Sequence, residues 1–165
     1  MAAAPPLERL QPALLDRLTD LEPDKKVESR DGRIMSTRRF EESVLRDLGW
    51  LLNANNLEAV EDLQDFPEVR ASVLNFGIPD FSGLVATGMS ASALERAVHT
   101  AITTFEPRLE RTTLRVSVVA EPGDEQRNAL AFRIEAQLWA EPLPVSLYLK
   151  TELDLETGAI AVTGS

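Results

Sequence analysis

A short charged motif, Glu106-Pro107-Arg108, is the part of the sequence whose residue types and spacing most clearly suggest chemistry. We expect Glu106 at the C-terminus of a helix, where the helix dipole disfavours a carboxylate by about 0.3–1 kcal/mol. Since Pro107 fixes a bend between the two charges, Arg108 is positioned either to offset the charge of Glu106 as a local cap or to reach a partner. If the pair is buried, removal of one member would cost about 3–5 kcal/mol.

Other catalytic arrangements find little support in the residue inventory. His99 is the only histidine and falls on the polar face of a predicted helix, where a solvated side chain is expected. The chain has no cysteine, no phosphate-binding loop and too few ligands for a zinc site, so we predict no metal and no cofactor. A carboxylate pair drawn from residues such as Asp80 and Glu106 leaves peptidoglycan hydrolysis as an enzymatic alternative. The aromatic residues lie mostly at core-like positions, and we therefore predict a protein that is not an enzyme.

Length and composition indicate one ordinary globular domain with a short arm. The chain has 165 residues, 44% of them apolar, and carries a net charge of −10, which disfavours nucleic acid as a partner. No secretory signal and no apolar run of about 20 residues is visible, so direct insertion into a membrane is not expected. The absence of cysteine fits a reducing compartment. These features together predict a cytoplasmic protein.

Charge is distributed unevenly along the chain. Basic residues gather in one stretch, formed by Lys25, Lys26, Arg30, Arg33, Arg38 and Arg39. Acidic residues gather in another, formed by Glu58, Glu61, Asp62, Asp65 and Glu68. Such runs are typical of solvated faces and less often of docking surfaces.

The N-terminal region predicts a short amphipathic arm. Its leucine spacing favours a helix of about two turns from Pro12 to Asp20, which must dock because it is too short to be stable alone. It could dock on its own domain or on a partner, and its candidate contact residues are Leu14, Leu15, Arg17 and Leu18. Residues 22–35 are polar and rich in turn formers. We therefore divide the chain into an arm with a linker, 1–35, and a domain, 36–165.

Helical periodicity dominates the next part of the chain. A helix is predicted over 37–52, capped by Ser36 or Thr37, with an inward stripe made of Phe40, Val44, Leu48, Leu51 and Leu52. Arg38 and Arg39 fall in its first turn, where the dipole disfavours cations. They are therefore either solvated arginines or candidates for contact with an acidic partner.

Two further helices are expected before the pattern changes. Asn55 or Asn56 can cap a brief helix that ends before Pro67 and points Leu57, Val60 and Leu63 inward. The turn-rich apolar segment 72–84 should pack against the domain. A helix over 92–105 is predicted to begin with a capping box formed by Ser92 and Glu95, and its buried stripe comprises Leu94, Val98, Ala101, Ile102 and Phe105.

After Pro107 the apolar period falls from 3.6 to 2, which indicates strands with one buried face. Alternation covers 113–120, 130–138 and 145–152, and a last short strand is predicted from Ala159 to Val162. The connecting segments at 121–128 and 141–144 have the length of hairpin loops. Helices first and strands last predict an α+β fold, in which N-terminal helices pack on one face of a C-terminal antiparallel sheet of three to four strands.

Several of these segments carry a family resemblance that spans about residues 10–162. The helix ending in DLGWLLN, the segment SVLNFGIPDFSG and the bend FEPRL, which leads into antiparallel strands, together resemble the baseplate wedge proteins of contractile phage tails, a family once labelled lysozyme-like. The segment LLDRLTD at 14–20 is similar to the N-terminal element of TssE, the type VI secretion member of that family. A wedge protein of another contractile injection system is the alternative.

The resemblance implies a structural role. It implies a subunit that lies beside baseplate subunits of the TssF, TssG and TssK type, on the cytoplasmic side of the inner membrane. That subunit connects the baseplate to the first ring of sheath subunits of the TssB/TssC type, for which its sheet serves as a template. The resemblance further implies that the family's Glu-Pro-Arg motif, here Glu106, Pro107 and Arg108, is associated with sheath assembly. A sheet edge able to accept a strand from another protein agrees with this role.

Overall fold

The computed structural model describes residues 13–19, 23–24, 36–81, 90–119, 129–138, 145–154 and 159–164. Its longer elements are α1 (Leu14–Leu18), α2 (Thr37–Leu52), α5 (Ala91–Phe105), β1 (Arg115–Val119), β2 (Ala129–Leu138), β3 (Val145–Asp154) and β4 (Ile160–Gly164). Most of the predicted linker lies outside the described residues, and so do both predicted hairpin loops.

The C-terminal strands form one antiparallel sheet in the order β1-β2-β3-β4, so each strand pairs with its neighbour in sequence. β2 and β3 pair along their full length, from Ala129 opposite Asp154 to Leu138 opposite Val145. β1 and β4 are shorter and form the two edges. The four strands fall where the two-residue period predicted them, and the predicted α+β class is confirmed.

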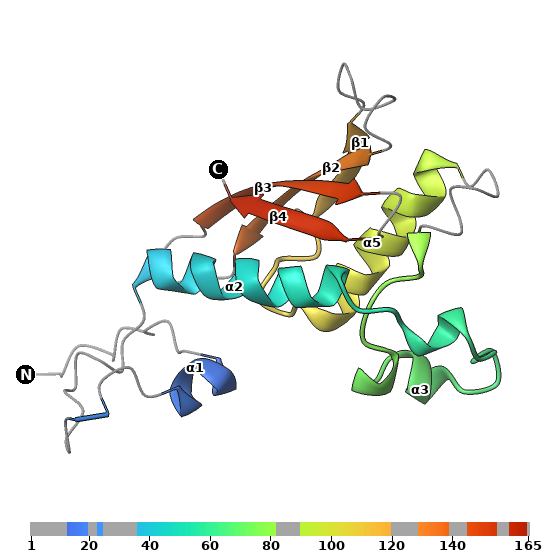
Figure 1. Cartoon of the computed structure of the whole chain (residues 1–165), viewed down its shortest axis with the longest axis horizontal. Coiled ribbons are helices and arrows are strands. Elements are labelled where there is room, and N and C mark those ends of the chain that lie inside the picture. Colours follow the sequence, from blue (N-terminus) through green and yellow to red (C-terminus); the bar gives the residue numbers. More distant parts are fainter. Residues whose placement is uncertain are drawn as a thin grey trace, which may run out of the picture.

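Two long helices and the sheet enclose the core (Figure 1). α5 packs against β1, α2 packs against β4, and the two helices also contact each other. The largest fully buried side chains come from both helices and from the two central strands: Phe132, Leu48, Leu51, Leu52, Leu94, Ile102, Ile134, Leu138, Leu149, Val44 and Val98. The helical stripes predicted from sequence are therefore the surfaces that cover the sheet.

The two long helices begin differently from each other. α2 has its predicted bounds and is capped by Ser36, whose hydroxyl accepts a hydrogen bond from the Arg39 amide at 3.3 Å. The capping box predicted for α5 is wrong. The N-cap is Ser90 without a side-chain cap, and the carboxylate of Glu95 accepts the Val118 amide of β1 at 2.8 Å instead. Glu95 has this competing backbone donor because α5 packs along that strand.

The segment between α2 and α5 is built from short turns of helix: η2 (Leu57–Ala59), α3 (Pro67–Arg70) and η3 (Val73–Asn75). Asn56 caps η2, as one of the two predicted alternatives, and Leu63 is buried. The inward position predicted for Val60 is wrong, since its side chain is 80% exposed. The three-residue 3₁₀ turn ends at Ala59, so the α-helical period used to place Val60 does not apply.

A tight backbone contact joins this segment to the end of α2. The Ile78 amide donates to the Ala54 carbonyl at 2.8 Å, and the Asn56 amide donates to the Ile78 carbonyl at 3.0 Å. Gly77 beside this bridge has φ 128°, and a Cβ there would lie 2.2 Å from the Ala54 oxygen. Only glycine fits this position. The prediction that the segment 72–84 packs against the domain holds for Ile78 and Phe81, which are buried, and is wrong for Val73 and Leu74, which are 81% and 68% exposed.

The N-terminal helix is shorter than predicted. α1 covers five residues, begins after Ala13 and ends at Leu18, while Pro12 and Asp20 lie outside the described residues. None of its residues is buried. A helix of this length has too few internal hydrogen bonds to persist alone, so its contacts with the domain determine its position.

Candidate functional site

The Glu-Pro-Arg motif lies where α5 ends and the chain turns toward β1. Glu106 is the C-cap residue of α5, and its backbone N–H donates to the Ile102 carbonyl. Across the bend, the Arg108 side chain reaches α2, where Ser43 and Asp47 are four residues apart and so lie on the same face of that helix. The tertiary packing of α2 beside α5 thus brings together charges that are about 60 residues apart in sequence.

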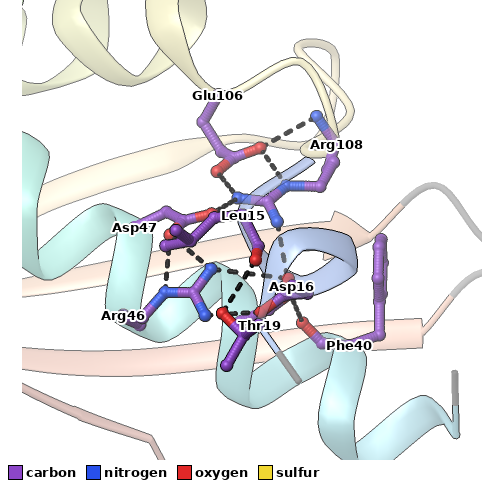
Figure 2. A network of polar contacts seen from close by, with 9 residues as sticks. Leu15, Asp16, Thr19, Phe40, Arg46, Asp47, Glu106 and Arg108 are labelled. Atoms are coloured by element: carbon purple, nitrogen blue, oxygen red, sulfur yellow. Dashed lines mark hydrogen bonds and ion pairs between the residues drawn. The ribbon is translucent and has the colours of Figure 1, made fainter. Parts of the chain in front are cut away.

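Glu106 and Arg108 form a multiply bonded ion pair (Figure 2). Oε1 of Glu106 accepts from Nε of Arg108 at 2.7 Å and from the Arg108 backbone N–H at 3.1 Å, and Oε2 accepts from Nη2. The Glu106 side chain is 4% exposed, so a lone carboxylate there would carry a large desolvation cost. The sequence left two roles for Arg108, a local cap that offsets Glu106 or a contact with a partner. The structure contains the first: the Arg108 guanidinium offsets the buried charge of Glu106.

The remaining donors of Arg108 bind α2. Nη2 contacts Oδ2 of Asp47 at 2.7 Å, and Nη1 donates to the Ser43 hydroxyl at 3.2 Å. Ser43 is itself buried and donates to the Phe40 carbonyl at 2.8 Å. Arg108 therefore ties the end of α5 to the middle of α2, and all three nitrogens of its guanidinium donate hydrogen bonds within the domain.

A second arginine extends the network to α1. Nε of Arg46 donates to Oδ1 of Asp47 at 2.9 Å, and Nη1 of Arg46 donates to Oδ1 of Asp16 at 2.6 Å (Figure 2). The Arg46 guanidinium also lies over the ring of Trp50, 5.2 Å from its centroid. We call the six residues that make up this network the charged cluster: Asp16, Ser43, Arg46, Asp47, Glu106 and Arg108.

The electrostatics of the charged cluster favour the ionised forms of Asp16, Arg46 and Arg108. The hydrogen bond from Arg46 is the main cause that lowers the pKa of Asp16 below its usual value of 3.8. The same hydrogen bond is the main cause that raises the pKa of Arg46. Burial works against the charge of Arg108, but its bonds to Glu106 and Asp47 outweigh this and raise its pKa. The Asp16 carboxylate, held in its ionised form, is therefore a poor general acid at neutral pH.

The predicted docking residues of α1 are exposed to solvent to different degrees. Leu14 is 70% exposed, Leu15 is 44% exposed and Leu18 is 73% exposed, and Arg17 is exposed as well. The polar side of the helix, represented by Asp16, makes the contact with α2. Within the described residues, α1 is therefore held to the domain by its charge, while Leu14 and Leu18 remain largely uncovered.

The two arginines at the start of α2 do not join the charged cluster. Arg38 pairs with Glu42 one helical turn away at 2.9 Å, and its side chain is 87% exposed. Arg39 is exposed, and its backbone N–H is the group that Ser36 caps. A partner contact for either residue stays a prediction.

A family model matches the larger part of this arrangement. The model for the baseplate wedge protein gp25 matches residues 38–143, a range that holds all but the first residue of α2, together with α5, β1, β2 and the Glu-Pro-Arg motif. The chain belongs to the gp25 baseplate wedge family. Neither a curated protein nor a solved structure matches the chain significantly.

Membership of the gp25 family supports a baseplate wedge role in a phage-like contractile assembly, with other baseplate and tail subunits as contacts. The matched range contains five of the six residues of the charged cluster and leaves out Asp16 with the rest of α1. No helix in the described part of this wedge-family chain is long and apolar enough to cross a membrane.

Four residues of the charged cluster escaped the sequence analysis: Asp16, Ser43, Arg46 and Asp47. One signal for two of them was present, because Ser43 and Asp47 are four residues apart on a helix whose neighbouring face is apolar. An aspartate next to a leucine stripe lies close to the core and needs a polar or charged partner there; in the structure Asp47 is half-buried and Ser43 is buried. Which cation approaches depends on how α5 packs on α2, and the sequence pattern does not encode this.

Proposed function

We propose that this chain is a structural subunit of the baseplate wedge of a type VI secretion system. In this role it connects the baseplate to the first ring of the contractile sheath and acts through protein contacts without enzymatic activity. Its partners would be baseplate subunits of the TssF, TssG and TssK type and sheath subunits of the TssB/TssC type. Assembly would take place on the cytoplasmic side of the inner membrane.

The orientation of α1 is the observation that carries this proposal. A short helix with leucines 70% and 73% exposed at positions 14 and 18 has an apolar stripe that its own domain leaves uncovered. An amphipathic helix in that state fits the helix-in-groove mode of recognition, in which the apolar stripe is buried against a partner. We infer that α1 binds the baseplate through these leucines.

The charged cluster supports the second half of the proposal. It joins α1, through Asp16 and Arg46, to the Glu-Pro-Arg motif at the start of the sheet. A subunit that links a baseplate to a sheath needs one surface for each neighbour and a stiff connection between them. In this proposal α1 meets the baseplate, the sheet meets the sheath, and the cluster is the connection.

The test uses a variant in which both outward leucines are made polar, Leu14→Ser with Leu18→Ser, in the full chain produced in its own host. The expected result is loss of co-purification with baseplate subunits and of sheath assembly in live-cell imaging, at an unchanged Tm. The matched control is Val60→Ser with Val73→Ser, because these valines are 80% and 81% exposed on another part of the surface.

Baseplate binding that survives in the leucine variant would refute the role of α1. Equal loss in the valine control would show that any reduction of exposed apolar area is enough. The subunits that co-purify with the unmodified chain decide between the two assemblies considered. Recovery of phage-type tail subunits in place of type VI subunits would favour the alternative, a wedge protein of another contractile injection system.

A further inference from the structure

The sheet has one face that the two long helices do not cover. On the other face, side chains such as Ile134 and Leu149 pack into the core together with α2 and α5 and are fully inaccessible. Because side chains alternate along a strand, the residues between them lie on the opposite side, and those are exposed. We call that side the outer face and define it by exposed residues of all four strands: Arg115, Ser117, Arg133, Tyr148, Lys150 and Thr163.

Two cations lie directly opposite each other on the outer face. Arg133 of β2 is in register with Lys150 of β3, and both side chains are exposed. Like charges at opposed positions of neighbouring strands repel each other, so this pairing is unfavourable for the sheet by itself. The same row ends in Ser117 on β1 and Thr163 on β4, whose side chains are short and uncharged. An anion bound across the row would offset the repulsion.

An aromatic side chain extends this cationic row. The guanidinium of Arg133 lies over the ring of Tyr148, 5.9 Å from its centroid, and the tyrosine is 41% exposed. Arginine and tyrosine are enriched among the residues that contribute most to protein–protein binding. Because the cation–π contact already orders both side chains, a partner that binds them loses less conformational entropy.

A second arginine–aromatic contact, on α2, differs in one respect. There the guanidinium of Arg46 lies over the ring of Trp50, and the carboxylates of Asp16 and Asp47 pair with it. The guanidinium of Arg133 has the same kind of aromatic contact but no ion pair with any described residue. Its donors therefore remain available for a carboxylate from outside the chain.

We infer that the outer face binds an acidic segment of another protein, whose carboxylates meet Arg133 and Lys150 while an apolar side chain packs on Tyr148. Charge complementarity favours this occupant, because the opposed cations require negative charge. The net charge of −10 on the chain disfavours nucleic acid as the source of that charge. This surface is separate from α1 and from the charged cluster, so the inference goes beyond the proposed function and does not depend on which contractile assembly contains the chain.

The first experiment places a photo-crosslinking benzoylphenylalanine at Ser117 of the full chain in host cells, beside the cations and without replacing them. The control carries it at Gln64, an exposed position between η2 and α3. The expected result is a crosslink from position 117 that mass spectrometry maps to a segment of another protein rich in Asp and Glu, with at least tenfold less of this product from position 64. No crosslink, or capture only of nucleic acid, of a second copy of this chain or of a segment without acidic residues, would overturn the inference.

Arg133→Glu separates binding from stability. It places opposite charges across the two strands, so we expect a Tm equal to or higher than that of the unmodified chain, while the crosslink from position 117 falls at least fivefold. Arg111→Glu makes the same charge change at an exposed position before β1 and should leave the crosslink unchanged. An undiminished crosslink in Arg133→Glu, or an equal loss in Arg111→Glu, would refute the role of the cationic row. Arg133→Gln, which removes the charge without reversing it, should give an intermediate crosslink.

A binding measurement then uses a synthetic peptide with the crosslinked sequence and the purified full chain. Fluorescence anisotropy should show a Kd that rises at least fivefold between low and high salt, because exposed ion pairs are screened. The same peptide with Asn and Gln in place of Asp and Glu should bind at least tenfold more weakly. A Kd that does not change with salt, or equal binding of the two peptides, would contradict recognition through carboxylates.

Co-purification with baseplate subunits separates this inference from the proposed function. If the protein co-purifies with the baseplate but position 117 captures no acidic segment, the assignment of the outer face is wrong and the wedge function stands. If baseplate subunits are absent while position 117 captures an acidic segment that Arg133→Glu loses, the proposed function fails and the outer face keeps its assignment.

Discussion

The helices α1 and α2 both carry a leucine stripe, and they use it in opposite ways. In α2 the stripe is buried, with Leu48 fully inaccessible, and it covers β4. In α1 the stripe is exposed, and the helix contacts α2 through Asp16 on its polar side. Hydrophobic spacing thus indicates that a surface must be covered, but the covering surface can belong to the same chain or to another one.

The difference also separates stability from assembly. α2 has 16 residues and packs against the sheet and α5, so its apolar side chains contribute to the free energy of folding. α1 has five residues and no buried side chain, so its leucines contribute little until a partner covers them. Variants in the two helices should therefore affect different measurements.

The largest expected effect lies at the charged cluster, where the two helices are connected. Arg108→Ala should lower the free energy of unfolding by about 3–5 kcal/mol, because the carboxylate of Glu106 would stay buried without its partner. Equilibrium denaturation in urea measures this loss.

A double variant distinguishes the structural role of that pair from a role in assembly. Glu106→Gln with Arg108→Met removes both charges at similar volume and should regain most of the lost stability. Its effect on sheath elongation is then measured by live-cell imaging. A stable double variant that forms normal sheaths would show that the pair only caps α5, whereas a stable variant without sheaths would establish its part in assembly.

The next effect tests the comparison of the leucines directly. Leu48→Ala in α2 should lower the free energy of unfolding by about 2–5 kcal/mol, because it removes a fully buried side chain. Leu18→Ala in α1, at a side chain 73% exposed, should change the same quantity by less than about 0.5 kcal/mol. A large loss from Leu18→Ala would mean that α1 packs its leucines on its own domain in solution, and the contrast drawn above would be wrong.

The smallest effect concerns the ion pair that holds α1. Because Arg46 lowers the pKa of Asp16, the pair stabilises the docked helix at pH values above the usual 3.8. This contribution is lost as the pH falls through the lowered pKa. Asp16→Asn should release α1 at neutral pH and change the free energy of unfolding by at most about 1 kcal/mol.

Amide chemical shifts of residues 14–18, measured by NMR between pH 2.5 and 7, report the docking of α1. In the unmodified chain they should change below pH 3.8, and in Asp16→Asn they should correspond to the released helix throughout. Far-ultraviolet circular dichroism over the same range is the control for general acid unfolding. Identical shifts in the two proteins at pH 7 would show that the ion pair does not hold α1.

Much of the fold followed from the sequence because its signals are local. The buried face of α2, the stripe of α5 and the alternation in β1 to β4 each depend on the period of one element, which the chain specifies without reference to its neighbours. Two placements were wrong. At Val60 a 3₁₀ turn replaced the α-helical turn that the prediction assumed. At the Ser92–Glu95 box, the backbone N–H of Val118 in a neighbouring strand competed for the carboxylate of Glu95.

The sequence by itself determined the order of the elements, their buried faces and the Glu-Pro-Arg motif. Only the tertiary structure decided that Arg108 bonds Asp47 across the α2–α5 contact, that α1 attaches through Asp16, and that the side chains of Asn53 and Glu95 bond the backbones of the two edge strands. Each of these contacts joins residues that are 23 to 107 positions apart. Such pairs form only after the apolar faces have packed, because the packing of helices on the sheet sets which polar groups meet.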